Sequence, residues 1–126
     1  MIGKVDVINM TKSARPRVPF VAIKDKILGK DYELSLVFAT RALSKKLNFK
    51  HRGKNNPTNI LSFPLDKKSG EIFIEPVQVR LDAPNFDMSY TKFMKFLFIH
   101  GCLHLKGMQH SSTMDKAEQK FLKLFS

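Results

Sequence analysis

The histidine-rich run at residues 100–110 constrains the fold of this chain more than any other segment. It places His100, His104 and His110 within eleven residues of a chain that has only four histidines. On a helix, His100 and His104 would project from one face, one turn apart. Gly107 allows a left-handed backbone that ends the helix and turns the chain back, so that His110 can reach the same point. We therefore expect a helix and the loop after it to meet at a metal site.

The composition of this site predicts a catalytic rather than a structural metal. Three neutral imidazoles leave one tetrahedral position of zinc open for water. Zinc proteases with this spacing read H-E-x-x-H-x-x-G-x-x-H, where the glutamate is the general base. The glutamate position is Gly101 in this chain. The run thus predicts a zinc centre without the usual base for peptide hydrolysis, and a metalloprotease-like hydrolase is the main alternative.

The bulk composition indicates one globular domain. A chain of 126 residues, 43% of them hydrophobic, can bury a core without disulfides, so we expect a single domain over 1–126. The single cysteine, Cys102, fits a reducing compartment and should be a packed core thiol, because it points away from His100 and His104 on a helix. No apolar run approaches the roughly 20 residues of a membrane span, and no signal-peptide pattern opens the chain. These features predict a soluble, cytoplasmic protein that is not in a membrane.

The charge predicts a polyanionic partner. The chain has 22 Lys and Arg against 11 Asp and Glu, a net charge of +11. Such a field attracts polyanions and speeds their encounter. Nucleic acid is the first candidate and an anionic membrane the second, while a basic surface that serves only solubility is the simplest alternative.

Hydrophobic periodicity predicts an α/β (α+β) fold, in which a small mixed β-sheet is packed with helices. Strands are expected over 5–9, 32–40, 58–63 and 71–74, with Pro64 ending the third. Helices are expected over 19–28, 42–49 and 91–106, with a last one from Thr113. Residues 50–57 read as a loop and residues 77–87 are weakly patterned. The helix over 91–106 is apolar nearly all round, so we expect it to be central and buried.

Two motifs together resemble one family. The run from His100 to His110 is similar to H-G-x-L-H-L-x-G-x-D-H, the signature of the YbeY family of bacterial endoribonucleases. Upstream, Arg52 and the segment 57–64, Pro-Thr-Asn-Ile-Leu-Ser-Phe-Pro, resemble the R-x-x-x-x-P-T-D-V-L-S-F-P segment of that family. Shorter matches are the Gly-Glu-Ile at 70–72 and the M-x-x-x-E formed by Met114 and Glu118. The chain departs from the pattern at Asn59 and Gln109, where the family has aspartates.

The resemblance implies a zincin-like fold and a zinc-dependent, single-strand-specific endoribonuclease. It implies one Zn²⁺ per chain, held by His100, His104 and His110, and no nucleotide cofactor. The implied partners are single-stranded RNA, ribosomal RNA and the ribosomal small subunit. The implied role is ribosomal RNA maturation at the 3′ end of the small-subunit RNA, together with ribosome quality control. A non-catalytic ribosome- or RNA-binding module with a structural metal is the second alternative.

The chemistry expected at such a site needs few residues. A zinc-bound water held by the three histidines would be the nucleophile, because zinc lowers the pKa of its water toward about 7. Arg52 could clamp the phosphate with two parallel hydrogen bonds and stabilise the developing charge, although it could also be a solvated loop arginine. Ser62 and Glu71 either lie near the substrate or have structural or surface roles. Glu118 is expected to stabilise its helix and the fold. RNA-backbone contacts are expected from a basic group formed by Lys45, Lys46, Lys50, Arg52 and Lys54, with Arg41 beside them.

Overall fold

A four-stranded sheet and the helices around it make up the protein, for which a computed structural model describes residues 4–126. The elements in chain order are β1 (Val5–Asn9), α1 (Phe20–Leu28), β2 (Glu33–Phe38), α2 (Arg41–Arg52), β3 (Ile60–Asp66), β4 (Ser69–Ile74), α3 (Pro76–Asp82), the short 3-10 helix η1 (Ala83–Phe86), α4 (Tyr90–Leu105) and α5 (Ser112–Leu124). The predicted α/β (α+β) class with a small mixed sheet is confirmed.

The sheet has the strand order β1-β2-β4-β3. β1 pairs with β2 and β2 pairs with β4 in parallel, whereas β3 pairs with β4 in an antiparallel hairpin. β3 continues through Pro64 to Asp66, so the prediction that Pro64 ends this strand is wrong. Because β3 is an edge strand, it tolerates a residue that cannot donate to the ladder.

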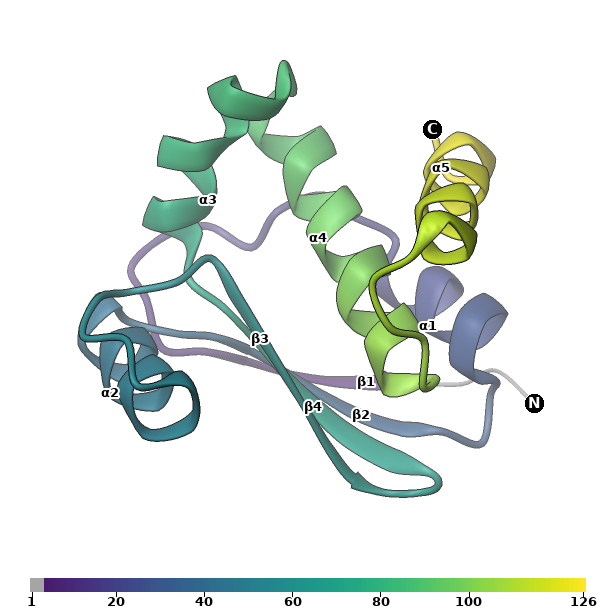
Figure 1. Cartoon of the computed structure of the whole chain (residues 1–126), viewed down its shortest axis with the longest axis horizontal. Helices are drawn as coiled ribbons and strands as arrows, with labels where there is room; N and C mark the ends of the chain where they lie inside the picture. Colours follow the sequence, from purple (N-terminus) through teal and green to yellow (C-terminus); the bar gives the residue numbers. More distant parts are fainter. Residues whose placement is uncertain (1–3) are drawn as a thin grey trace.

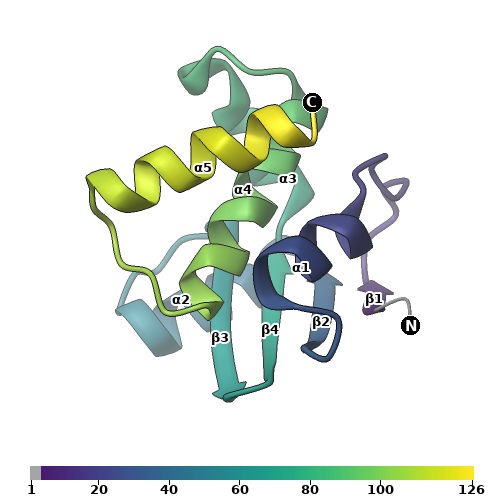
Figure 2. The same ribbon diagram turned by 90° about the vertical axis from the view of Figure 1, so that its right-hand side faces the viewer.

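Helix α4 lies at the centre of the molecule. It crosses one face of the sheet and contacts β3, β4, α1, α3 and α5 (Figure 1). α2 lies on the opposite face, and the view turned by 90° shows the same two sides (Figure 2). The core between α4, α1 and the sheet includes Phe20, whose ring makes edge contacts with Phe38 and Phe98 at centroid distances of 5.9 and 4.8 Å. The prediction of a central, buried helix is confirmed.

A buried lysine closes the end of α1. The side chain of Lys24 is fully buried, and its Nζ donates to the carbonyl oxygens of Gly29, Lys30 and Tyr32 at 3.0–3.3 Å. Asp25 lies 2.7 Å from the same ammonium group. The buried ammonium group thus satisfies carbonyl groups of the connection between α1 and β2, where no regular backbone ladder supplies donors.

Two helical segments differ from the prediction. α2 does not end at Phe49 but runs to Arg52, so Lys50, His51 and Arg52 form its last turn rather than a loop. Gly53 ends it with a left-handed backbone at φ 70°. The weakly patterned residues 77–87 lie mostly in α3 and η1. Within residues 4–126, no helix combines the length and the apolar character needed to cross a membrane.

Candidate metal centre

Three histidine side chains meet at the C-terminal end of α4. His100 and His104 lie one turn apart on this helix, and their Nε2 atoms are 2.9 Å from each other. His110 follows in the connection to α5, and one ligand atom from each of the three residues lies within 4.8 Å of the others. The structure therefore brings together the three residues that the sequence spacing selected. A group of this composition and size can hold a metal ion.

The turn after α4 brings His110 to the other two. Gly107 has φ +105°, a conformation that L side chains rarely adopt, and its N–H donates to the carbonyl of His104. The N–H of Met108 donates to the carbonyl of Leu103 at 3.0 Å. The chain thus folds back over the end of its own helix, as predicted from Gly107.

Two groups outside the triad orient its rings. Nδ1 of His104 lies 3.1 Å from the carbonyl oxygen of Met108, and Nδ1 of His100 lies 3.1 Å from Oε2 of Glu118. Glu118 is on α5 and is almost fully buried. When Nδ1–H donates to such an acceptor, Nε2 carries the free lone pair that a metal requires.

The two histidines of α4 favour the neutral form. Burial, followed by the nearby His110 and Arg52, lowers the pKa of His100 from its ordinary 6.5 to about 4. Burial also lowers the pKa of His104, with His100 as the next cause. Burial and the nearby Asp115 raise the pKa of Glu118. Because the imidazole of His100 is neutral at pH 7, its contact with Glu118 is a hydrogen bond from Nδ1–H to the carboxyl group.

The donor set fits a zinc ion. Zinc is commonly bound by neutral imidazole nitrogens, and three such ligands are typical of sites that keep one coordination position open. Metal-ligating histidines almost always donate their other ring N–H to a carboxylate, a carbonyl or water. His100 and His104 each meet this condition.

Gly101 allows α4 to approach the sheet closely next to the triad. A Cβ built on Gly101 would lie 2.9 Å from Oγ of Ser62, 3.0 Å from Cδ1 of Ile72 and 3.1 Å from Cδ1 of Ile60. The space that a side chain would need is thus already filled by β3 and β4. The position after the first histidine has no room for a glutamate.

A cavity of about 260 Å³ opens at the triad. Its lining consists of Arg52, Ile60, Ser62 and the three histidines. Arg52 comes from the last turn of α2 and Ser62 from β3, so three separate elements contribute to the site. Glu71 alternates with Ile72 along β4 and therefore points to the opposite face of the sheet.

The predicted basic group is only partly at this site. Lys45, Lys46 and Lys50 are exposed on α2 and Lys54 is exposed just after it, and neither cavity beside the triad includes them in its lining. Arg41 is engaged elsewhere, because its guanidinium lies 3.5 Å from the buried carboxylate of Glu75 and donates to Gln78.

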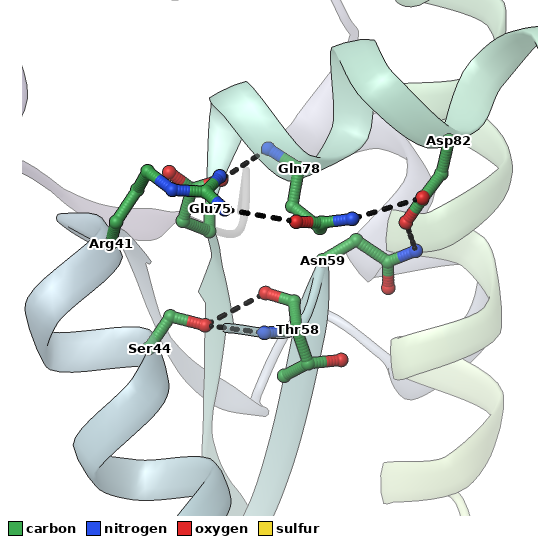
Figure 3. A network of polar contacts seen from close by, with 7 residues as sticks. All are labelled: Arg41, Ser44, Thr58, Asn59, Glu75, Gln78 and Asp82. Atoms are coloured by element: carbon green, nitrogen blue, oxygen red, sulfur yellow. Dashed lines mark hydrogen bonds and ion pairs between the residues drawn. The ribbon is translucent and has the colours of Figure 1, made fainter. Parts of the chain in front are cut away.

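Arg41 belongs to a polar network that ends at Asn59. Figure 3 shows the order Arg41, Glu75, Gln78, Asp82 and Asn59. Gln78 and Asn59 both donate to the carboxylate of Asp82, at 3.0 Å each. Because the amide nitrogen of Asn59 is used in this way, its oxygen is left as the group that can accept. Asn59, where the family pattern has an aspartate, is thus a donor to a neighbouring carboxylate.

One residue that sequence reasoning assigned differently is Glu118. The sequence predicts that it stabilises its helix and the fold, whereas the structure shows that its carboxylate contacts a histidine of the triad, His100. Its burial follows from the apolar face of α5, which also buries Met114 and Leu122. The family motif M-x-x-x-E was the only sequence signal that pointed to it.

Comparisons with known proteins find matches to one family. A family model described as Endoribonuclease YbeY matches residues 4–124. The Endoribonuclease YbeY of Pseudoalteromonas translucida is 34% identical over 111 residues, which cover 80% of this chain and 73% of that protein. The Endoribonuclease YbeY of Bdellovibrio bacteriovorus is 30% identical, with coverage of 94% and 88%. The solution structure of TM1509 from Thermotoga maritima matches with a TM-score of 0.70 and 25% identity, over 95% of this chain and 87% of that one.

Proposed function

Because the chain belongs to the Endoribonuclease YbeY family, we propose that it is a zinc-dependent endoribonuclease that hydrolyses phosphodiester bonds in single-stranded RNA. The observation that carries this proposal is the shared cavity of the three histidines and Arg52. It joins a set of metal ligands to a cation suited to a phosphate. The preference for single strands comes from the family resemblance.

His100, His104 and His110 hold one Zn²⁺ in this proposal. When bound, zinc supplies a Lewis acid and lowers the pKa of water to near neutrality. Glu118 and the carbonyl of Met108 hold the two rings of α4 in the tautomer that directs Nε2 to the metal. The three ligands carry no negative charge, so the site keeps its full attraction for an anionic substrate.

Arg52 binds the scissile phosphate. Its guanidinium presents a planar fork that matches two phosphate oxygens. The side chain is exposed but lines the cavity of the triad, so a phosphate can reach both. In this position it stabilises the charge that develops on the non-bridging oxygens.

The remaining surface attracts RNA. The net charge of +11 draws a polyanion to the protein, and Lys45, Lys46, Lys50 and Lys54 add exposed cations on α2 and just beyond it. Ribosomal RNA and the ribosomal small subunit are the proposed partners, with maturation of the 3′ end of the small-subunit RNA and ribosome quality control as the role. A cytoplasmic location stays a prediction from the composition.

Two other functions fit the site less well. A zinc peptidase of the H-E-x-x-H class needs a glutamate at position 101, where the sheet leaves no room for a side chain. A non-catalytic RNA-binding module would use the metal for stability alone. The three histidines line a cavity instead of a closed core, which favours catalysis.

The decisive experiment combines metal analysis with cleavage. Zinc-loaded protein should contain about one equivalent of zinc, as a single three-histidine site requires, and should cleave single-stranded RNA but not duplex RNA. His104→Ala should lose both the metal and the cleavage. Chelation should abolish cleavage while the circular dichroism spectrum is kept. A His104→Ala variant with full zinc content, or cleavage that survives chelation, would contradict the proposal.

A further inference from the structure

A second cavity, of about 410 Å³, opens directly beside the triad. It shares Arg52, Ile60, His100 and His110 with the smaller cavity, so a ligand can extend from one into the other. The proposed chemistry uses only the smaller cavity. The larger cavity, which we call the aromatic groove, has no role in that chemistry.

Three phenylalanines line the aromatic groove with nearly parallel rings. Phe86 stacks on Phe93 at a centroid distance of 4.8 Å and an interplanar angle of 23°. Phe93 stacks on Phe96 at 6.2 Å and 13°, and Phe96 lies 6.4 Å from the ring of His100. The row of rings thus leads from η1 along α4 to the proposed metal ligands.

Phe86 is the most exposed member of this row. It is 53% exposed, whereas Phe93 is fully buried and Phe96 is partly buried. Phe86 packs on Phe93 but retains exposed apolar surface that water does not solvate well. A flat, apolar ligand could cover this ring.

The groove also has polar groups in its lining that can accept hydrogen bonds. They include the carboxyl groups of Asp115 and Glu118, of which Glu118 already contacts His100. Asn59 also lines the groove, and Asp82 fixes its amide so that the oxygen is the accepting group (Figure 3). Acceptors of this kind suit the amino groups on the edges of nucleobases.

We propose that the aromatic groove is a nucleobase subsite, in which an unpaired base of the bound RNA stacks on Phe86 while Arg52 binds the backbone. This inference rests on the proposed function, since it takes RNA as the substrate. Every base has a face that can stack on an aromatic ring, so the subsite requires an available base more than a particular sequence. A base in a duplex is already paired and stacked, so the subsite disfavours duplex RNA.

The test is a double-mutant cycle that combines one substitution in the protein with one change in the RNA. Zinc-loaded protein cleaves a labelled single-stranded RNA under single-turnover conditions, and an abasic nucleotide replaces each base around the mapped cleavage site in turn. Phe86→Leu removes the flat ring but keeps an apolar side chain. Phe86→Tyr keeps the ring. Leu65→Ala truncates another exposed apolar residue, at the end of the β3-β4 hairpin.

The proposal predicts a specific pattern of results. Phe86→Leu should raise the half-saturating protein concentration by about 5-fold or more, the lower end of the effect of one base–aromatic stack, with the rate at saturation little changed. Phe86→Tyr and Leu65→Ala should behave as wild type. One abasic position should weaken wild-type binding similarly, and at that position Phe86→Leu should add no further loss.

Two outcomes would overturn the subsite. One is that Phe86→Leu and the wild type cleave the unmodified RNA with the same half-saturating protein concentration. The other is a loss from Phe86→Leu that is the same on every abasic RNA, which would mean that the ring does not contact a base. A wild-type protein that holds zinc but cleaves no RNA would refute the proposed function instead. Fluorescence anisotropy with the same variants and RNAs would then still decide whether Phe86 binds a base.

Discussion

Oε2 of Glu118 lies 3.1 Å from Nδ1 of His100, and the two residues come from helices that are neighbours in the chain but joined by a sharp turn. The carboxyl group is buried and points at the ring from the side opposite Nε2. Its contact fixes both the orientation and the tautomer of a proposed zinc ligand. Glu118 is therefore a positioning residue for the proposed metal site.

Removing this carboxylate should weaken zinc binding without abolishing it. Loss of such an outer partner typically lowers metal affinity or activity about 10- to 100-fold. Glu118→Gln should show the lower end of this range, because its amide can still accept from Nδ1–H. Competition with a chromophoric chelator measures the affinity. Glu71→Gln removes a carboxylate on the opposite face of the sheet, and an equal effect from that change would refute the positioning role.

Arg52→Lys should separate binding from catalysis. The lysine keeps the charge but loses the two-pronged contact with phosphate. We expect zinc content and RNA affinity to change little, while the single-turnover rate falls about 10²- to 10³-fold, by analogy with the loss of one oxyanion-hole donor. A variant that binds weakly but cleaves normally at saturation would make Arg52 a docking residue.

RNA affinity should fall steeply with salt. Each phosphate that a lysine neutralises contributes about −0.7 to the slope of log affinity against log salt for a single strand. Replacing Lys45 and Lys46 by glutamine should therefore make the slope shallower by about 1.4. A matched pair, Lys92 and Lys123, lines a separate cavity between the start of α4 and the end of α5. The same slope change from both pairs would show that α2 has no special role.

Gly101→Ala should destabilise the fold. Its Cβ would meet Ser62 and Ile72 at 2.9–3.0 Å, and overpacking of this kind typically costs about 1–3 kcal/mol. Alanine recovers up to about 1 kcal/mol through its higher helix propensity, so the net loss in the free energy of unfolding should stay measurable by urea titration. Adding Ser62→Ala removes the nearest atom and should restore part of the loss. A Gly101→Ala variant more stable than wild type would mean that α4 can move away from the sheet.

Acidification should destabilise the metal-free protein through His100. Its pKa is about 4 in the folded protein and 6.5 ordinarily, so between these values the unfolded chain binds the proton and the folded chain does not. The contribution is present above pH 6.5 and is lost as the pH falls toward 4. The melting temperature of wild type, relative to that of the non-titrating His100→Asn, should fall over this range. A constant difference would contradict the depressed pKa.

The sequence predicted features that depend on local spacing. Helix geometry holds His100 and His104 on one face, and Gly107 directs the turn that follows. The triad could therefore be predicted without knowing any contact between distant segments. The close approach of Gly101 to β3 could not be predicted from local spacing. The sequence showed that the general-base glutamate is absent at this position, but only the packing of α4 on the sheet shows why a side chain does not fit there.

Contacts between distant segments could not be predicted. Glu118 is 18 residues from His100, and their contact depends on how α5 packs against α4. Arg41 was grouped with the lysines of its helix, but Glu75, at the start of α3, engages it. Phe86 lies in a weakly patterned segment, and its stacking on Phe93 follows from the way η1 returns toward α4. In each case the deciding partner belongs to another element.

The triad is divided between two parts of the fold that are held with different firmness. His100 and His104 belong to the helix around which the core is built. His110 lies in the connection between α4 and α5 and is itself exposed. Two corners of the candidate site are thus fixed by the packing of the core, whereas the third depends on the turn that begins at Gly107. A change in that turn would open the candidate site and leave the core as it is.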